Sequence, residues 1–252
     1  MTKRLVLILG DQLDQDAAIF HEFDPTNDTL WMAEVLEEST HIPSSKQRTA
    51  VFLSAMRHFA EHLKARDWPL IYSRLDDAHN TGTLIGELRR AIAHTRAECL
   101  VMNAPGDWRV LQQLRALAKE LDLPLEIRDD THFFSTVREF SAHAKGRKQL
   151  RLEYFYRELR QKNNILMADD KPIGNQWNFD AENRGSFGKQ GPSPLPAPTR
   201  FAPDTITQEV IDLVNDTLVH HPGSLTQFGW PVTREQALVA LDEFITHRLP
   251  NF

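Results

Sequence analysis

Five short apolar segments alternate with longer segments of mixed polarity through the first half of this sequence. The apolar segments span residues 5–9, 30–35, 70–73, 99–103 and 125–128, and their side chains are almost continuously apolar. Such runs are typical of parallel strands covered on both faces, because neither face then needs to be polar. We therefore expect these five segments to form one parallel β-sheet.

The segments between the expected strands have the spacing of amphipathic helices. Residues 46–66 place apolar side chains four apart, and residues 83–95 and 107–121 continue the same kind of pattern. Strands and helices that alternate in this way form a doubly wound parallel sheet with right-handed crossovers. The predicted fold class is therefore α/β, with a five-stranded, Rossmann-like domain over residues 1–130.

The pattern changes after residue 130. A basic helix is expected over residues 146–162, and five prolines between positions 192 and 203 favour an extended connector. Two further helices are expected over 207–218 and 233–248, the second with Thr233 as its N-cap. We expect residues 131–206 to form a mainly helical connector and residues 207–252 to begin another helical domain.

Composition limits the functions that the chain can have. Cys99 is the single cysteine, so the chain has no internal disulfide and no cysteine-ligated iron–sulfur cluster, which favours a reducing, cytoplasmic location. No apolar run approaches the ~20 residues that span a bilayer. The net charge of −6 disfavours a broad electrostatic attraction to nucleic acid, although a local basic patch is compatible with it.

Polar residues and glycines follow the first, second and fourth expected strands. In an open parallel sheet, ligands bind at the carboxyl ends of the strands, where the strand order reverses. Residues 10–12, 33–38 and 104–107 meet this condition and predict a polar-rimmed slot for a planar ligand. The sequence has neither glycine-rich phosphate-binding motif, which disfavours a dinucleotide or ATP. In the alternative interpretation, the glycines are turn residues and the acidic residues are solvated.

The basic segment 146–162 allows two interpretations. It is either an interdomain helix with its aromatic residues packed inside, or a surface that contacts nucleic acid phosphates through its arginines. The loop 177–184 combines aromatic, amide and arginine side chains, and it either approaches nucleic acid or fills the space between domains. We find no nucleophile motif and no metal-binding motif, and we predict no catalytic residue in this chain.

Five motifs resemble those of a known family. They are LILGDQL at 7–13, SAMRHF at 54–59, PGDWR at 105–109, EYFYR at 153–157 and WNFDAENR at 177–184. In this order, they resemble the deoxyribodipyrimidine photolyase-related proteins, which are bacterial iron–sulfur (6-4) photolyases and cryptochrome-like proteins. The resemblance extends from about residue 4 to residue 252.

The resemblance implies an antenna domain that binds 6,7-dimethyl-8-ribityllumazine. The residues that the resemblance assigns to the lumazine site are Gly10, Asp11, Gln12, Ala33, Glu34, Glu38, Phe52, Met56 and Gly106. Some relatives have cysteine where this chain has Ala33. The resemblance also implies that Arg184 contacts damaged DNA, and Arg157 and Arg160 of the basic segment are the further candidates for this contact. Asn175 replaces a glycine that is common before the loop 177–184.

In this family a C-terminal helical domain holds FAD and a four-cysteine [4Fe–4S] cluster, and the reduced flavin repairs the (6-4) lesion. This chain ends where that domain begins, so the resemblance implies an antenna and connector that is inactive alone and contains neither FAD nor iron. The alternative is a flavin-free module that binds a chromophore or a nucleotide-like ligand, or a blue-light sensor fragment. We also expect the helix over 233–248 to expose apolar side chains and to promote self-association.

Overall fold

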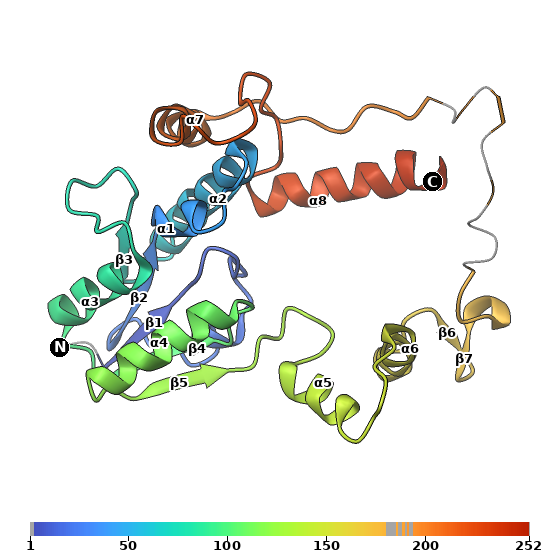
Figure 1. Ribbon diagram of the computed structural model, residues 1–252, viewed down its shortest axis with the longest axis horizontal. Coiled ribbons are helices and arrows are strands. Elements are labelled where there is room, and N and C mark those ends of the chain that lie inside the picture. Colours follow the sequence, from blue (N-terminus) through green and yellow to red (C-terminus); the bar gives the residue numbers. More distant parts are fainter. Residues whose placement is uncertain (1–2, 180–184, 186–187, 190, 192–193, 252) are drawn as a thin grey trace. The chain divides into compact units, whose positions relative to one another are not determined.

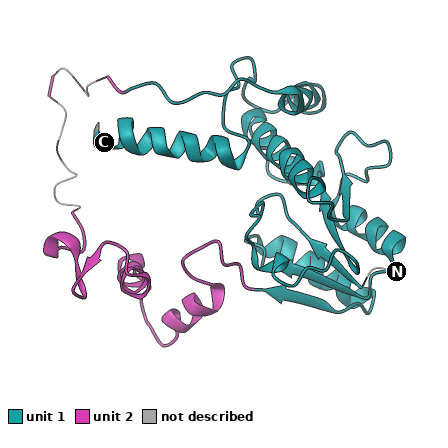
Figure 2. Ribbon diagram, turned by 180° about the vertical axis from the view of Figure 1, so that it is seen from behind, with its two compact units in different colours: residues 1–128, 196–252 teal, residues 129–195 magenta. Residues whose placement is uncertain are grey.

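The computed structural model describes residues 3–179, 185, 188–189, 191 and 194–251 (Figure 1). The chain forms two compact units, shown in Figure 2: residues 1–128 with 196–252, and residues 129–195. Arg184 lies outside the described residues. No helix in the described part of the chain is both long enough and apolar enough to cross a membrane.

A five-stranded parallel sheet forms the centre of the first unit. Its strands, in chain order, are β1 Arg4–Leu7, β2 Asp28–Ala33, β3 Leu70–Ser73, β4 Cys99–Asn103 and β5 Leu125–Arg128. The spatial order is β3-β2-β1-β4-β5, and every neighbouring pair is parallel. All five strands were predicted from the sequence, and the α/β fold class is confirmed. The strand order reverses beside β1, which is where a ligand site is expected.

Helices bury both faces of the sheet. On one face, Val6, Leu30 and Val101 pack in a cluster with α2, Lys46–Lys64, and α7, Thr205–Thr217. On the other face, Leu5, Trp31 and Leu100 pack with α3, Leu84–Thr95, and α4, Trp108–Glu120. Because neighbouring residues of a strand point to opposite faces, β1, β2, β3 and β4 each contribute side chains to both clusters, whereas β5 contributes Leu125 and Ile127 to the second cluster alone. This explains why the sequences of β1, β2 and β4 are mostly apolar without alternation.

Side-chain caps fix where these helices begin. The Ser45 hydroxyl accepts a hydrogen bond from the Arg48 backbone N–H at the start of α2. At the start of α4, the Asp107 carboxylate accepts one from the backbone N–H of Arg109 at 2.7 Å. Thr233 caps α8, Arg234–Glu243, as the sequence predicted. Such caps satisfy N–H groups that have no partner within the helix.

The connection between β1 and β2 departs from the usual alternation. Residues 8–27, all of them described, contain a single 3₁₀ turn, η1 (Ala18–Phe20), and no α-helix. A dinucleotide fold places a helix N-terminus at this point, directed at the pyrophosphate. The turn after β1 therefore offers no such helix end.

The unit of residues 129–195 contains two short helices and a two-stranded hairpin. Its elements are α5 Val137–Ala144, α6 Leu152–Asn163, β6 Met167–Ala168, β7 Lys171–Pro172 and the 3₁₀ turn η2 Ile173–Asn175. The sequence prediction of one helix over 146–162 was wrong in its start. Gly146 has a φ of +76°, which ends the helical path, and α6 begins at Leu152. Asn175 has a φ of +57°, a left-handed backbone conformation that favours glycine and that asparagine also adopts.

The last helical segment contains none of the buried residues. It consists of α8, a π-helical turn over Phe244–Arg248 and a 3₁₀ turn over Leu249–Asn251. Leu238, Leu241 and Ile245 are each about half exposed, at 54%, 52% and 50%. The expected exposure of apolar side chains on this helix is therefore observed, and self-association stays a prediction.

Candidate ligand pocket at the carboxyl ends of the strands

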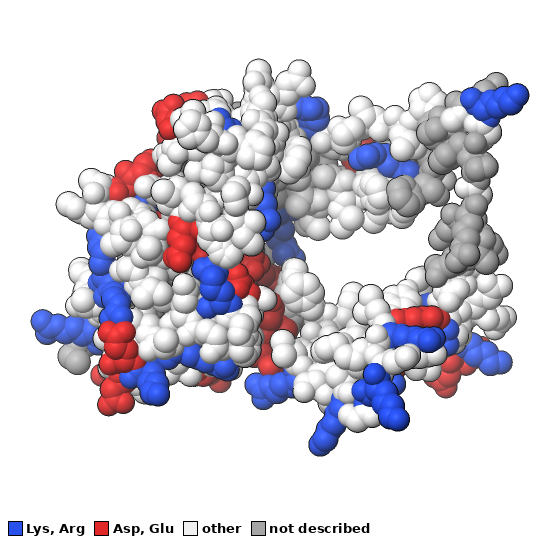
Figure 3. All heavy atoms as spheres, viewed as in Figure 1, with Lys and Arg blue, Asp and Glu red and all other residues white. Residues whose placement is uncertain are grey.

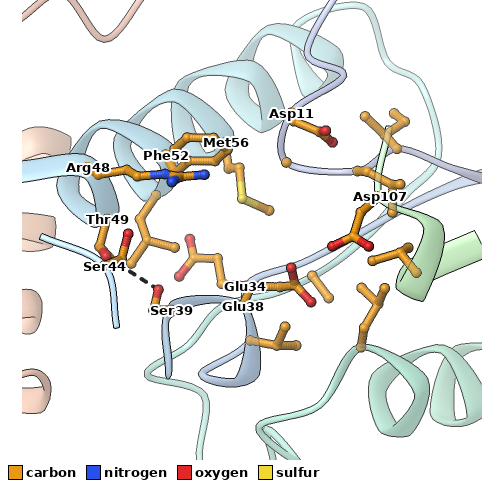
Figure 4. A pocket seen from close by; sticks show the side chains of 18 of the residues that line it. Asp11, Glu34, Glu38, Ser39, Ser44, Arg48, Thr49, Phe52, Met56 and Asp107 are labelled. Atoms are coloured by element: carbon orange, nitrogen blue, oxygen red, sulfur yellow. Dashed lines mark hydrogen bonds between the residues drawn. The ribbon is translucent and has the colours of Figure 1, made fainter. Parts of the chain in front are cut away.

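A cavity of about 250 Å³ opens at the carboxyl ends of β1 and β2, beside the start of α4 (Figure 4). Seven of the nine residues predicted for the ligand site line this cavity: Gly10, Asp11, Ala33, Glu34, Glu38, Phe52 and Met56. The parallel sheet brings these residues together because the carboxyl ends of its strands share one edge.

The two other predicted residues lie beside the cavity and do not line it. Gln12 is buried, and its side-chain amide donates a hydrogen bond to the Ala104 carbonyl at 3.0 Å. This bond ties the turn after β1 to the end of β4. At Gly106, a Cβ would come within 3.9 Å of a carboxylate oxygen of Asp11. Gln12 and Gly106 thus shape the walls of the cavity.

Helix α2 forms one wall. Arg48, Phe52 and Met56 follow one another at intervals of four, so they share one face of the helix. The Arg48 guanidinium lies over the Phe52 ring, 5.5 Å from its centroid, and Figure 4 shows both side chains on the same side of the cavity. A Cβ at Gly10 would lie 2.9 Å from the Met56 sulfur, which explains why glycine suits this position.

Acidic side chains gather on the opposite side of the cavity, where Figure 4 shows Asp11 and Asp107. Arg109 binds this cluster together. Its guanidinium donates to both carboxylate oxygens of Glu38, at 2.8 and 3.0 Å, and lies 3.4 Å from Asp107. Burial lowers the pKa of Arg109, but its hydrogen bond with Glu38 and the other carboxylates outweigh burial, so the pKa is raised. The Glu38 carboxylate therefore lies at the rim of the cavity as the partner of Arg109 in an ion pair.

The segment that carries Glu38 is α1, Glu37–Thr40, and it is held from two directions. Glu37 accepts a hydrogen bond from the Leu84 backbone N–H at 3.3 Å and one from Gln113 at 3.4 Å. On the other side, the Thr49 hydroxyl of α2 donates to Ser39 at 3.4 Å. These contacts fix the rim of the cavity between α2 and α4.

Glu34 differs from the other acidic residues because its carboxylate is occupied inside the protein. It accepts two hydrogen bonds from Arg57, at 2.8 and 3.0 Å, and others from the Tyr72 hydroxyl and the Leu75 backbone N–H. Glu34 is 1% exposed and Arg57 is 4% exposed. Burial and the neighbouring Glu34 raise the pKa of Tyr72. The Glu34 carboxylate therefore stabilises the wall from within.

The sequence prediction missed several residues that line the cavity, of which Arg48 is the most informative, and it placed Asp107 in the slot segment 104–107 without assigning it to the lumazine site. For Arg48 a signal was present, since it lies one helical turn before Phe52 and two before Met56. For Asp107 the signal was its position before the helix at 108–120, where an aspartate caps the first turn. In the described part of the chain, no group of three or more His, Cys, Asp or Glu residues is placed to hold a metal ion.

Of the residues predicted to contact DNA, Arg157 and Arg160 are described, and both lie on α6 of the unit of residues 129–195. Arg157 pairs with Glu153 on α6, and its guanidinium lies 5.3 Å from the centroid of Trp177. Arg160 is buried, and it donates hydrogen bonds to the carbonyls of Ile165 and Leu166 beyond the helix end. Both guanidinium groups thus have partners within the unit, and phosphate contact by them stays a prediction.

Acidic and basic side chains are interspersed on the face of the sheet unit seen in Figure 3. This distribution agrees with the net charge of −6 and with the absence of a dominant basic surface on that face. The cavity is therefore the feature of this unit with the most specific chemistry.

Comparison with known proteins identifies the family of this chain. Residues 6–230 match the family model described as deoxyribodipyrimidine photo-lyase-related protein. The chain is also similar to a (6-4) photolyase of Agrobacterium fabrum, with 42% identity over 250 residues. That alignment covers 99% of this chain and 49% of the relative, so the chain spans about half the length of the curated relative it matches. The chain belongs to the deoxyribodipyrimidine photolyase-related family.

Proposed function

We propose that this chain is the antenna and connector part of a light-driven photolyase that repairs (6-4) pyrimidine lesions, and that its cavity binds 6,7-dimethyl-8-ribityllumazine. The observation that carries the proposal is the cavity itself. It lies where the strand order reverses, has an aromatic wall on α2, and has carboxylates at the opposite side. The family membership supports a photolyase-like role.

The lining suits a planar ligand with a hydroxylated side chain. Phe52, Met56 and Val110 provide apolar surface against which a fused ring system would pack. Asp11, Asp107 and Glu38 provide oxygens that would accept hydrogen bonds from ribityl hydroxyls. When bound, the lumazine would absorb light, and the residues of this chain would hold and orient it.

The remaining parts of the proposal concern the longer protein. A [4Fe–4S] cluster would be held outside this chain, since four cysteines ligate it and Cys99 is the single cysteine here. We propose that FAD is held there as well. Damaged DNA would be the substrate of the complete photolyase, with Arg157, Arg160 and Arg184 as proposed phosphate contacts. We also propose a cytoplasmic location, because a chain with a single cysteine forms no internal disulfide and suits a reducing compartment.

One observation favours a second candidate function. Every residue that lines the cavity belongs to the sheet unit, so a ligand site is complete without residues 129–195. A flavin-free chromophore-binding module would need no more than this. Measuring whether the bound lumazine transfers excitation to a flavin in the longer protein separates an antenna from such a module.

Titration of lumazine into the purified chain, followed by fluorescence, tests the proposal. Phe52→Ala removes the aromatic wall and should weaken binding at least about tenfold, as expected for losing a buried aromatic contact. The matched control is Phe134→Ala, because Phe134 is an exposed phenylalanine of the other unit. Its affinity should equal that of the wild type. Absence of saturable binding to the wild-type chain would refute the proposed ligand.

A further inference from the structure

The cavity has an uneven distribution of charge. Four carboxylates line it, those of Asp11, Glu34, Glu38 and Asp107, whereas Arg48 is the single lysine or arginine among its lining residues. Of the four, Glu34 is neutralised by Arg57 inside the protein. The carboxylates of Glu38 and Asp107 share Arg109 at the rim of the cavity, and Arg48 lies across from Asp107 (Figure 4).

On the acidic side of the cavity, the guanidinium of Arg109 is shared among three carboxylates. Arg109 lies 2.8 Å from Glu38, 3.4 Å from Asp107 and 3.7 Å from Glu37. One positive charge cannot neutralise three carboxylates, so the group keeps a net negative charge. Its electrostatic effect extends over several ångströms, because the Debye length is ~8 Å at physiological ionic strength.

The helix end that usually binds phosphate in this fold class is also occupied. Parallel α/β folds bind phosphates at helix N-termini beside the point where the strand order reverses. Here the Asp107 carboxylate caps α4 and accepts the Arg109 backbone N–H at 2.7 Å. The connection after β1 contains no α-helix among residues 8–27, all of which are described. A phosphate at the start of α4 would meet the Asp107 carboxylate. A phosphate after β1 would find no helix N-terminus to bind it.

On the basis of the proposed function, we propose that the pocket selects an uncharged ribityl ligand over its phosphate ester, and that Asp107 and Glu38 make this selection. The hydroxyls of a polyol donate hydrogen bonds to carboxylates. A phosphate dianion cannot do so, and it is repelled by the same groups. The pocket thereby disfavours phosphate esters of molecules that carry a similar fused ring and the same ribityl chain.

The experiment compares lumazine with its 5′-phosphate ester on the full chain at low ionic strength, by fluorescence titration. We expect the ester to bind at least about tenfold more weakly than lumazine, as like-charge repulsion at a partly buried site predicts. Raising the salt concentration should reduce this ratio, because salt screens the repulsion.

Conservative variants assign the effect to residues. Asp107→Asn keeps a good helix cap, and Glu38→Gln keeps an acceptor for Arg109. Each should reduce the discrimination about threefold or more, mainly by improving binding of the ester. Glu120→Gln is the matched control, since Glu120 lies at the far end of α4 and pairs with Arg89. Its discrimination ratio should equal that of the wild type.

The outcomes are distinct. If wild-type chain binds the ester as tightly as lumazine, or more tightly, the selection is refuted while the proposed ligand stands. If Asp107→Asn and Glu38→Gln both leave the discrimination ratio unchanged, the carboxylates do not make the selection and the proposal is again refuted. If lumazine itself fails to bind, the proposed function fails, and the selection fails with it.

Discussion

The sheet unit and the unit of residues 129–195 obtain their structure in different ways. In the sheet, Trp31 and Leu114 are completely buried, and both faces are covered by helices. In residues 129–195, by contrast, only His143, Phe155, Arg160 and Pro172 are buried among the described residues. Phe133, Phe134 and Leu152 are between 66% and 78% exposed. Burial of apolar side chains therefore stabilises the structure of the first unit, whereas local hydrogen bonds and ion pairs stabilise much of the structure of the second.

The largest expected difference between the two units concerns their ion pairs. Arg57→Ala would leave the Glu34 carboxylate buried without its cation, which typically costs about 3–5 kcal/mol. Arg157→Ala removes the Arg157–Glu153 pair of the second unit, whose side chains are 32% and 40% exposed, and it should cost only about 1 kcal/mol. Urea unfolding followed by circular dichroism measures both free energies. Equal losses would show that burial does not separate the units.

Truncating apolar side chains should also destabilise the first unit more than the second, with a smaller difference in the free energy of unfolding. Leu114→Ala creates a cavity between α4 and the sheet and should lower the free energy of unfolding by about 2–5 kcal/mol. Leu152→Ala changes a side chain that is 78% exposed and should change that free energy by no more than about 0.5 kcal/mol. A loss above 2 kcal/mol at Leu152 would mean that an additional surface covers it.

The smallest expected effect is a pH dependence in the sheet unit. Hydrogen bonds from Asn27 and Thr26 lower the pKa of Asp24 from 3.8 to about 2. Since the folded pKa lies below the unfolded one, this stabilisation is present above pH ~4 and is lost as the pH falls towards 2. NMR titration of the Asp24 carboxyl measures it. Asn27→Ala should move the pKa back towards 3.8, and an unchanged value would exclude the Asn27 contact as its main cause.

The second unit has a corresponding carboxylate. Glu158 accepts a hydrogen bond from His143 at 2.7 Å, and this contact, together with Arg147, lowers its pKa. His143→Gln should raise the pKa of Glu158 in an NMR titration. The stabilisation that it gives is also lost as the pH falls through the folded pKa. If the pKa of Glu158 stays the same, Arg147 is its main partner.

The sequence was sufficient to predict elements that bury a continuous apolar face. The five strands and the helices at 46–64, 84–95 and 108–120 were found because their periodicity reflects the core. Helix α5 was missed, although Thr136 and Glu139 form a capping box at its start. It has eight residues and buries only His143, so its apolar pattern was too short to indicate a helix.

The candidate site was predictable to a similar degree. Strand ends and the family resemblance gave seven of the residues that line the cavity. They did not show that the Glu34 carboxylate points into the protein, because that depends on Arg57 of α2 and Tyr72 of β3 meeting it in space. The pairing of Glu38 with Arg109 likewise joins residues 71 positions apart. Such long-range pairs leave no periodic signal in the sequence.

A crystal structure of the chain with 6,7-dimethyl-8-ribityllumazine tests the central proposal most directly. The proposal predicts that the ring lies against Phe52 and Met56, with the ribityl hydroxyls within hydrogen-bonding distance of Asp11, Asp107 or Glu38. Ring density elsewhere would contradict it, for example in the separate cavity lined by His58, His62 and Arg234. Crystals that contain no ligand at saturating lumazine would contradict it as well.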